Sequence, residues 1–258
     1  MDNKKFDRII RNPRHISGVH NYCDRWCERC PFTLRCSVYA MELEMQKDRP
    51  PHDKKLEELW PRLEAAKEMA ERVLGEQADH AGVGLAKDPI FKMEDRPLST
   101  SRIGAAAKRY MEFAHRFMQQ HQRTIPATPP APEVHDVSAG EAFDVITFYC
   151  FFIGAKVSRA LSRHLFDEQI ESDPRMKDMP RDQDGSAKIA LIAIDRSVLG
   201  WAVLQLHVPE AREAAFSGML TLHRMRMAME KAFPKARGFV RPGFDTHRFP
   251  ERRKTPDA

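Results

Sequence analysis

Long stretches of the chain place apolar residues three and four positions apart, which is the spacing of one helix face. The clearest stretch is residues 99–121, where seven residues share a face: Ile103, Ala106, Ala107, Tyr110, Phe113, Ala114 and Phe117. The same spacing predicts helices over residues 53–77, from 138 to about 170, over 187–207 and from 209 to about 233. Residues 142–155 are apolar almost all round, so we expect this segment to be the buried central helix of a bundle.

Local signals support these helix boundaries. Ser138 and Glu141 have the spacing of a capping box at the start of the central helix. Pro209 stands where a first helical residue is favoured, and Pro61 should kink or divide the first helix. Proline-rich polar segments near residues 124–137 and 172–185 are predicted to be loops.

No stretch alternates between apolar and polar residues as a strand does, and no internal repeat is present. The sequence therefore predicts an all-α fold, a bundle of about five long helices with a small N-terminal cysteine module. We expect the module at residues 1–50, the bundle at 51–236, and a flexible basic tail at 237–258.

Charge and composition narrow the setting of the protein. The formal net charge is +5, but residues 1–36 carry +4, residues 237–258 carry +3, and the body carries −2. Solvated basic ends explain this pattern better than a nucleic-acid-binding stripe does. We see no signal-peptide core and no apolar run long enough for a membrane span, so we expect a cytoplasmic protein that does not enter a membrane.

Four of the five cysteines lie within the segment HNYCDRWCERCPFTLRC, at Cys23, Cys27, Cys30 and Cys36. The first three have the spacing of one helix face, so they could be packed as small apolar residues. Pro31 fits poorly in a continuing helix, and Cys36 falls off that face. Because disulfides are rare in the cytoplasm, clustered cysteines there indicate metal or redox chemistry.

Four thiolates can complete a tetrahedral zinc site or hold the irons of a 4Fe–4S cluster. Zinc sites usually join two cysteine pairs a dozen or more residues apart, whereas these four lie within fourteen residues and include a Cys-Pro step. We therefore predict a 4Fe–4S cluster, with Zn²⁺ and cysteines without metal as the alternatives. A helix starting after Cys30 would turn its positive end toward the thiolates. His15 and His20 are reserve ligands.

The sequence CDRWCERC also resembles the Cys-x3-Cys-x2-Cys motif of the radical S-adenosylmethionine enzymes. The resemblance covers only Cys23, Cys27 and Cys30. It implies a 4Fe–4S cluster whose open iron binds the cosubstrate, in a βα barrel, and Cys36 could instead close that fourth iron. The longer segment HNYCDRWCERCPFT is similar to segments of uncharacterised bacterial proteins, and this similarity implies no function.

Polar residues on apolar helix faces are the other candidates. Asp195 falls on the apolar stripe of its helix and needs a partner, for which Lys156, Arg159 and His164 are the candidates. His223 lies on an apolar face too, and only convergence with His164 on Asp195 would indicate a site. Glu112 and His115 form half of a di-iron motif but point away from the apolar face of their helix, so we expect a solvated pair.

The sequence thus predicts a metal-binding helical protein in a redox, sensing or binding role. The alternatives are a zinc-stapled protein-interaction module with an unidentified protein partner, and a nucleic-acid binder using the basic ends with exposed Tyr22 and Trp26. The motifs of common NTPases, hydrolases and dehydrogenases are absent, and no catalytic residue is assigned.

Overall fold

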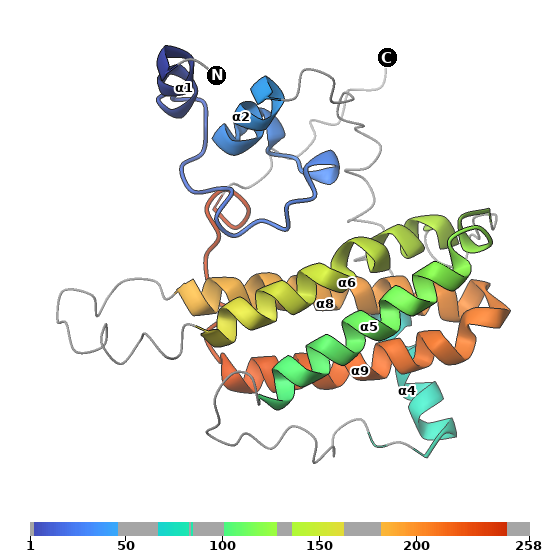
Figure 1. Ribbon diagram of the computed structural model, residues 1–258. Helices are drawn as coiled ribbons and strands as arrows, with labels where there is room; N and C mark the ends of the chain where they lie inside the picture. Colours follow the sequence, from blue (N-terminus) through green and yellow to red (C-terminus); the bar gives the residue numbers. More distant parts are fainter. Residues whose placement is uncertain are drawn as a thin grey trace, which may run out of the picture. The chain divides into compact units, whose positions relative to one another are not determined.

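The computed structural model describes residues 3–45, 67–82, 84, 101–127, 136–162 and 182–246. The chain divides into two compact units. The first combines Met1–Glu57 with Val240–Ala258, and the second is Glu58–Phe239. All regular elements within the described ranges are helices, so the all-α prediction is confirmed for them (Figure 1).

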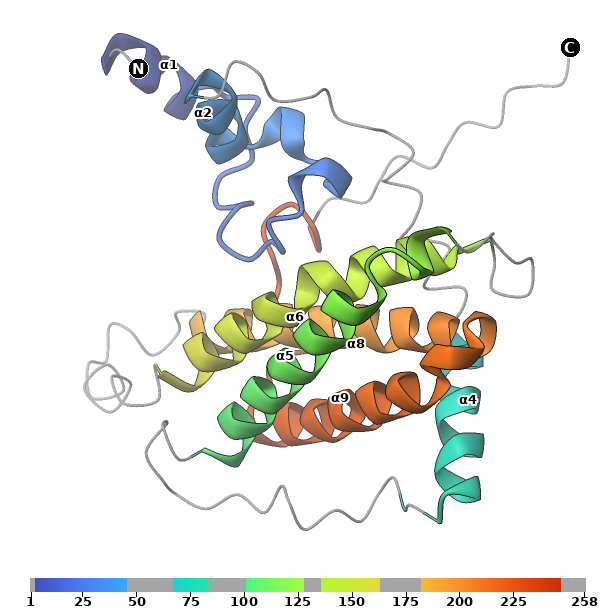
Figure 2. The same cartoon turned by 45° about the vertical axis from the view of Figure 1, so that its right-hand side comes forward.

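The second unit is a bundle of five α-helices: α4 (Lys67–His80), α5 (Arg102–His121), α6 (Ala139–Ser162), α8 (Asp182–His207) and α9 (Arg212–Ala232). Helix α8 packs along α6 and α9, and α5 lies against the same two helices (Figure 2). Helix α4 contacts α8 and α9. Short 3-10 helices follow α5 at Ile125–Ala127 and precede α9 at Pro209–Ala211.

Aromatic residues fill the centre of this bundle. Trp201 of α8 is fully buried, and its indole Nε1 donates a hydrogen bond to the hydroxyl of Tyr110, 3.0 Å away. Gly218 lets α9 approach this indole, because a Cβ atom there would lie 2.7 Å from the ring. The buried hydroxyl and indole N–H satisfy each other, so the pair joins α5 to α8 without an unpaired polar atom on the Trp201 ring.

Helix α8 is long and apolar enough, by length and composition, to cross a membrane. In the bundle, however, 78% of its apolar window is buried inside the structure. The core helix of a bundle passes the same test of length and hydropathy, so this helix is weak evidence for a membrane span. Helices α6 and α8 together form the interior of the bundle, whereas the sequence pointed to residues 142–155 of α6 alone.

The helix starts follow the predicted chemistry. The Ser138 amide donates to Glu141 Oε2 at 2.9 Å, and the Glu141 amide donates to Ser138 Oγ at 3.1 Å, so the capping box is confirmed. Pro209 opens a 3-10 turn that leads into α9. Helix α8 begins at Asp182, five residues before the predicted start at residue 187. Residues 182–185 of the predicted loop are therefore helical, because their polar side chains are compatible with a first helical turn. Residues 53–66, 128–135 and 163–181 lie outside the described residues.

The first unit contains two short helices, α1 (Asn3–Ile10) and α2 (Ser37–Met45), and two 3-10 helices at Cys27–Arg29 and Thr33–Arg35. These bring the α-helices among the described residues to seven rather than about five. Helices of eight and nine residues are too short for a periodicity window to detect.

The predicted tail contributes to the first unit. Residues 240–246 form a turn beside the N-terminal chain, where the red segment meets the blue loops in Figure 1. Gly243 has a φ of +80°, and a Cβ atom there would lie 2.9 Å from Val19 Cγ2. A flexible tail was predicted from residue 237, but this close backbone approach holds residues 240–246 in place. Residues 247–258 lie outside the described part of the chain.

Candidate metal centre

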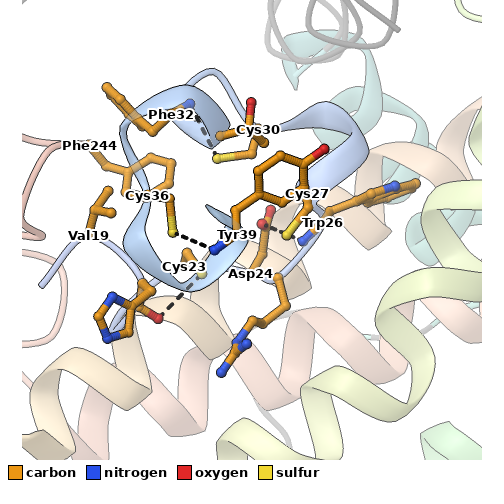
Figure 3. A pocket seen from close by; sticks show the side chains of 13 residues that line it. Val19, Cys23, Asp24, Trp26, Cys27, Cys30, Phe32, Cys36, Tyr39 and Phe244 are labelled. Carbon is orange, nitrogen blue, oxygen red and sulfur yellow. Dashed lines mark hydrogen bonds between the residues drawn. The ribbon is translucent and has the colours of Figure 1, made fainter. Parts of the chain in front are cut away.

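The four N-terminal cysteines line one small cavity of the first unit. Cys23, Cys27, Cys30 and Cys36 all contribute to its wall, and Figure 3 shows their sulfur atoms around a common space. The volume of this cavity is about 20 Å³. One water needs roughly 10–15 Å³, so the thiols surround a space slightly larger than a single water molecule.

Two tight turns place the first three thiols. Arg25 has a φ of +63°, which reverses the chain between Cys23 and Cys27. The Trp26 amide donates to Asp24 Oδ1 at 3.1 Å and secures this turn. The amide of Cys30 then donates to the Cys27 carbonyl at 3.2 Å and ends the 3-10 helix.

Cys36 occupies the N-terminal end of α2. Its backbone is extended, its carbonyl accepts from the Ala40 amide at 3.0 Å, and its Sγ accepts from the Tyr39 amide at 3.5 Å. This is the geometry of an N-cap residue, with sulfur in place of the usual oxygen. The predicted helix after Cys30 is only the 3-10 helix Thr33–Arg35, which ends at the extended backbone of Cys36. The helix dipole is therefore offered to Cys36 rather than to Cys30.

Backbone hydrogen bonds also reach the thiols of Cys30 and Cys23. The Phe32 amide donates to Cys30 Sγ at 3.4 Å, across the Cys-Pro step. The Cys23 thiol donates to the His20 carbonyl at 3.4 Å. Amide donors aimed at sulfur stabilise negative charge on it, which is the form that binds metals.

The protein alone holds two of these thiols in their neutral form. Burial raises the pKa of Cys30 to about 12, against the smaller opposing effect of the Phe32 amide, and Asp24, Cys23 and Cys27 raise it further. Burial likewise raises the pKa of Cys23. Bringing buried thiols together makes ionisation costly, and a bound cation reverses this effect by compensating the charge.

As the side chains stand, no group of three or more His, Cys, Asp or Glu donors in the described ranges is close enough to hold one metal ion. The four thiols thus share a cavity without forming a single-ion coordination sphere.

Apolar side chains enclose the cavity. Val19, Phe32, Tyr39 and Phe244 line it, and the rings of Phe32 and Phe244 meet edge to face with centroids 4.9 Å apart. The guanidinium of Arg241 lies over the ring of Phe244, 4.8 Å from its centroid. Phe244 could not have been predicted as part of the site, since it lies more than 200 residues from the cysteines.

Trp26 also lies against the cavity, with only 9% of its surface exposed. The Arg29 guanidinium stacks on its ring at 4.1 Å. The assumption that Trp26 is exposed for nucleic-acid stacking is therefore wrong, because the indole packs against the turn that carries the cysteines. Tyr22 is half-buried.

The two reserve histidines have different surroundings. His20 lines the cysteine cavity, and its Nδ1 is buried without a hydrogen-bond partner among the described residues. Burial and then the charge of Arg25 lower its pKa. His15 is not part of the cavity wall, and its Nδ1 lies 2.9 Å from the Ile9 carbonyl oxygen. Of the two, only His20 is placed beside the thiols.

In the second unit, Asp195 finds partners other than those expected. Its carboxylate accepts from Arg237 at 2.6 Å and lies 3.6 Å from Arg226 Nη1. Arg226 Nη2 lies 2.9 Å from His223 Nδ1, so Asp195 and His223 share a neighbour. The sequence favoured partners on α6, but the end of α9 and the turn after it approach Asp195 instead. His164 lies outside the described residues.

The remaining candidates behave as structural residues. Glu112 is exposed and pairs with Lys108 at 4.0 Å, while His115 contacts Gln119 at 3.1 Å and packs against the Phe151 ring. Cys150 is fully buried in the bundle, as expected for a packed cysteine. The Glu112 and His115 pair and Cys150 therefore do not support a second metal site.

Comparison with known proteins adds no identification: no protein-family model, no curated protein and no solved structure matches the chain. The described residues also contain no strand, so the barrel implied by the radical S-adenosylmethionine resemblance is not found among them.

Proposed function

We propose that the first unit holds a 4Fe–4S cluster on Cys23, Cys27, Cys30 and Cys36, and that the protein is a redox or sensing protein of the cytoplasm. The observation that supports this most directly is the shared cavity, since four thiols from one short segment line it together. Packing alone would need no such arrangement, and Cys150 packs in the bundle without any other cysteine nearby in the sequence.

The spread of the four thiols, and not the volume between them, favours a cluster over zinc. At a Zn–S distance of about 2.3 Å, four thiolates close around one ion and leave no space for water between them. No three donors of the described residues converge on one point, and the cavity of about 20 Å³ would have to widen to hold the eight iron and sulfide atoms of a cluster. A 4Fe–4S cluster binds each cysteine through a different iron, so its thiolates stand farther apart than zinc ligands do.

The surroundings of the thiols also suit a cluster. Amides of Phe32 and Tyr39 donate to two of the sulfurs, and aromatic rings cover the cavity. Hydrogen bonds to sulfur and exclusion of solvent are the features by which proteins set the reduction potential of such clusters. With four cysteines as ligands, all irons are closed to substrate. Electron transfer or sensing therefore suits the site better than catalysis at an open iron.

The deciding experiment is anaerobic purification followed by a visible spectrum and metal analysis. Wild type and Cys150→Ala should both show a broad band at about 400 nm and about four irons per chain, whereas Cys27→Ser should lose both. Cys150→Ala is the matched control, because it removes a cysteine outside the cavity. A colourless protein with one zinc per chain would support the zinc-stapled interaction module instead. Wild-type protein without either metal would overturn the metal centre.

A further inference from the structure

The first unit carries the whole net charge of the protein. Its two segments contain 17 lysines and arginines against 12 aspartates and glutamates, while the second unit contains 25 of each. The net charge of +5 thus belongs entirely to the unit that holds the cysteines. A charge confined to one unit affects which partners that unit meets, by steering partners of opposite sign toward it.

Four exposed arginines of this unit form what we call the arginine patch: Arg8, Arg11, Arg14 and Arg35. Arg8 and Arg11 line an open hollow of about 490 Å³ with Asp7. Arg35 lies against the chain that carries Arg14. Its Nε donates to the Arg14 carbonyl at 3.4 Å, and its own carbonyl accepts from the Ile16 amide at 2.9 Å.

These arginines are not neutralised by the protein. None of the four forms an ion pair within the part of the chain that the structure describes, whereas the neighbouring Arg25 pairs with Glu42 at 3.5 Å. Guanidinium groups without carboxylate partners are available to an acidic surface. Guanidinium is the cation best suited to bind a carboxylate through two parallel hydrogen bonds.

An exposed apolar residue adjoins the patch. Leu34 has 88% of its surface exposed, directly precedes Arg35, and lies on the turn between Cys30 and Cys36. Consecutive Cα atoms are about 3.8 Å apart, so the Cα of Leu34 is within about 8 Å of the Cα of Cys36. A partner that contacts Leu34 would thus come close to a ligand of the proposed cluster.

We infer that Leu34 and the arginine patch form the docking surface for a small acidic electron-carrier protein; this inference rests on the proposed 4Fe–4S centre. An apolar contact beside unpaired charge is suited to brief, steered encounters between redox proteins. In the complex, one electron leaves the reduced carrier, which is oxidised by one electron, and the cluster is reduced by one. No bond is formed or broken, and no proton is transferred.

An acidic protein fits this surface better than a nucleic acid does. A protein that binds single-stranded nucleic acid without sequence preference needs exposed aromatic side chains on which the bases stack. Trp26, however, is buried under Arg29. The exposed residue beside the patch is an aliphatic leucine, which makes apolar contacts with protein surfaces.

The test uses the purified holoprotein and a plant-type 2Fe–2S ferredoxin as the acidic probe. Binding of labelled ferredoxin and electron exchange are measured between 20 and 200 mM salt. Exchange is started once with reduced ferredoxin and once with the reduced holoprotein, so that the result does not depend on which protein has the higher reduction potential. Three variants are compared: Arg14→Glu/Arg35→Glu, Leu34→Asp, and Arg212→Glu/Lys235→Glu. The last reverses two exposed charges of the second unit and serves as the control.

We expect the affinity of the wild type to fall about ten-fold or more over this salt range. The Arg14→Glu/Arg35→Glu and Leu34→Asp variants should bind ferredoxin about ten-fold more weakly and exchange electrons about ten-fold more slowly at low salt. Their iron content and their reduction by dithionite should be unchanged. The control variant should behave as the wild type. Equal rates for all variants, or no binding by the wild type, would overturn the docking surface while leaving the cluster intact.

Two further outcomes would also overturn the inference. Patch-dependent binding of a 20-base-pair duplex, without binding of ferredoxin, would identify a nucleic acid as the partner. A wild-type protein without iron would overturn the docking surface together with the proposed function, and iron analysis separates this case from the others.

Discussion

Phe244 packs edge to face against Phe32, with the two ring planes at 83°. Phe32 follows the Cys-Pro step, and Phe244 lies in the turn near the end of the chain. Through this contact, residues from both ends of the sequence enclose the cysteine cavity. The C-terminal turn therefore belongs to the candidate site.

Replacing Phe244 with alanine should open the cavity to solvent. We expect the 400-nm band of Phe244→Ala to bleach several-fold faster in air than that of the wild type, because the exclusion of water and oxygen protects a cluster. The half-life of the band in aerated buffer measures this. Phe151→Ala removes a half-exposed ring from the bundle and should leave the half-life unchanged. Equal half-lives for Phe244→Ala and the wild type would show that the turn does not shield the thiols.

Gly243→Ala should weaken the first unit for a backbone reason. The φ of +80° is unfavourable for alanine, and the new Cβ would approach Val19 Cγ2 to 2.9 Å. We expect a loss of roughly 1–3 kcal/mol of unfolding free energy, measured by urea denaturation of this unit. Gly75→Ala on helix α4 is the control, since a Cβ there meets no atom of the described residues within 4 Å. It should be neutral or slightly stabilising.

Asp195→Asn should destabilise the bundle moderately. The carboxylate joins α8 to Arg226 of α9 and to Arg237 beyond it, and Arg237 also contacts Glu230 at 2.8 Å. Because these side chains are partly exposed, water screens the network, and we expect a loss of about 1 kcal/mol. Thermal unfolding at low and high salt measures it. Glu76→Gln removes an exposed i, i+4 pair with Arg72 and should change little. An equal effect of both substitutions would show that the network adds no stability.

The bundle should lose stability in alkaline solution. Burial raises the pKa of Cys150 to about 11, from about 9 in the unfolded chain, and burial also raises the pKa of Tyr110. The unfolded state therefore releases protons first, so the contribution of Cys150 is complete below pH 9 and is lost as the pH rises to about 11.

Urea unfolding between pH 7 and pH 10.5, followed by circular dichroism, checks this expectation. The unfolding free energy of the wild type should decline above pH 9, by up to about 1.4 kcal/mol per pH unit for each such group. Cys150→Ala should show a shallower decline, although its stability at pH 7 is lower. Parallel pH profiles for the two proteins would mean that Cys150 does not contribute to the alkaline loss.

Local patterns in the sequence predicted the helices well. Helix α5 spans Arg102–His121, close to the predicted range of 99–121, because a wide apolar face and the Ser101 cap act within one element. The capping box at Ser138 is likewise a contact between residues three positions apart. The short helices α1 and α2 were missed, since eight or nine residues carry too little periodicity to stand out.

By itself, the sequence determined that the regular elements of the described residues are helices, and that four cysteines lie close together along the chain. It could not determine what surrounds them, because Phe244 and Val19 reach the cavity from distant positions through packing. Asp195 illustrates the same limit, as its place on the apolar stripe of α8 was visible but its partners, Arg226 and Arg237, were not. Helices form from contacts between residues a few positions apart, whereas sites form where the folded backbone brings remote side chains together.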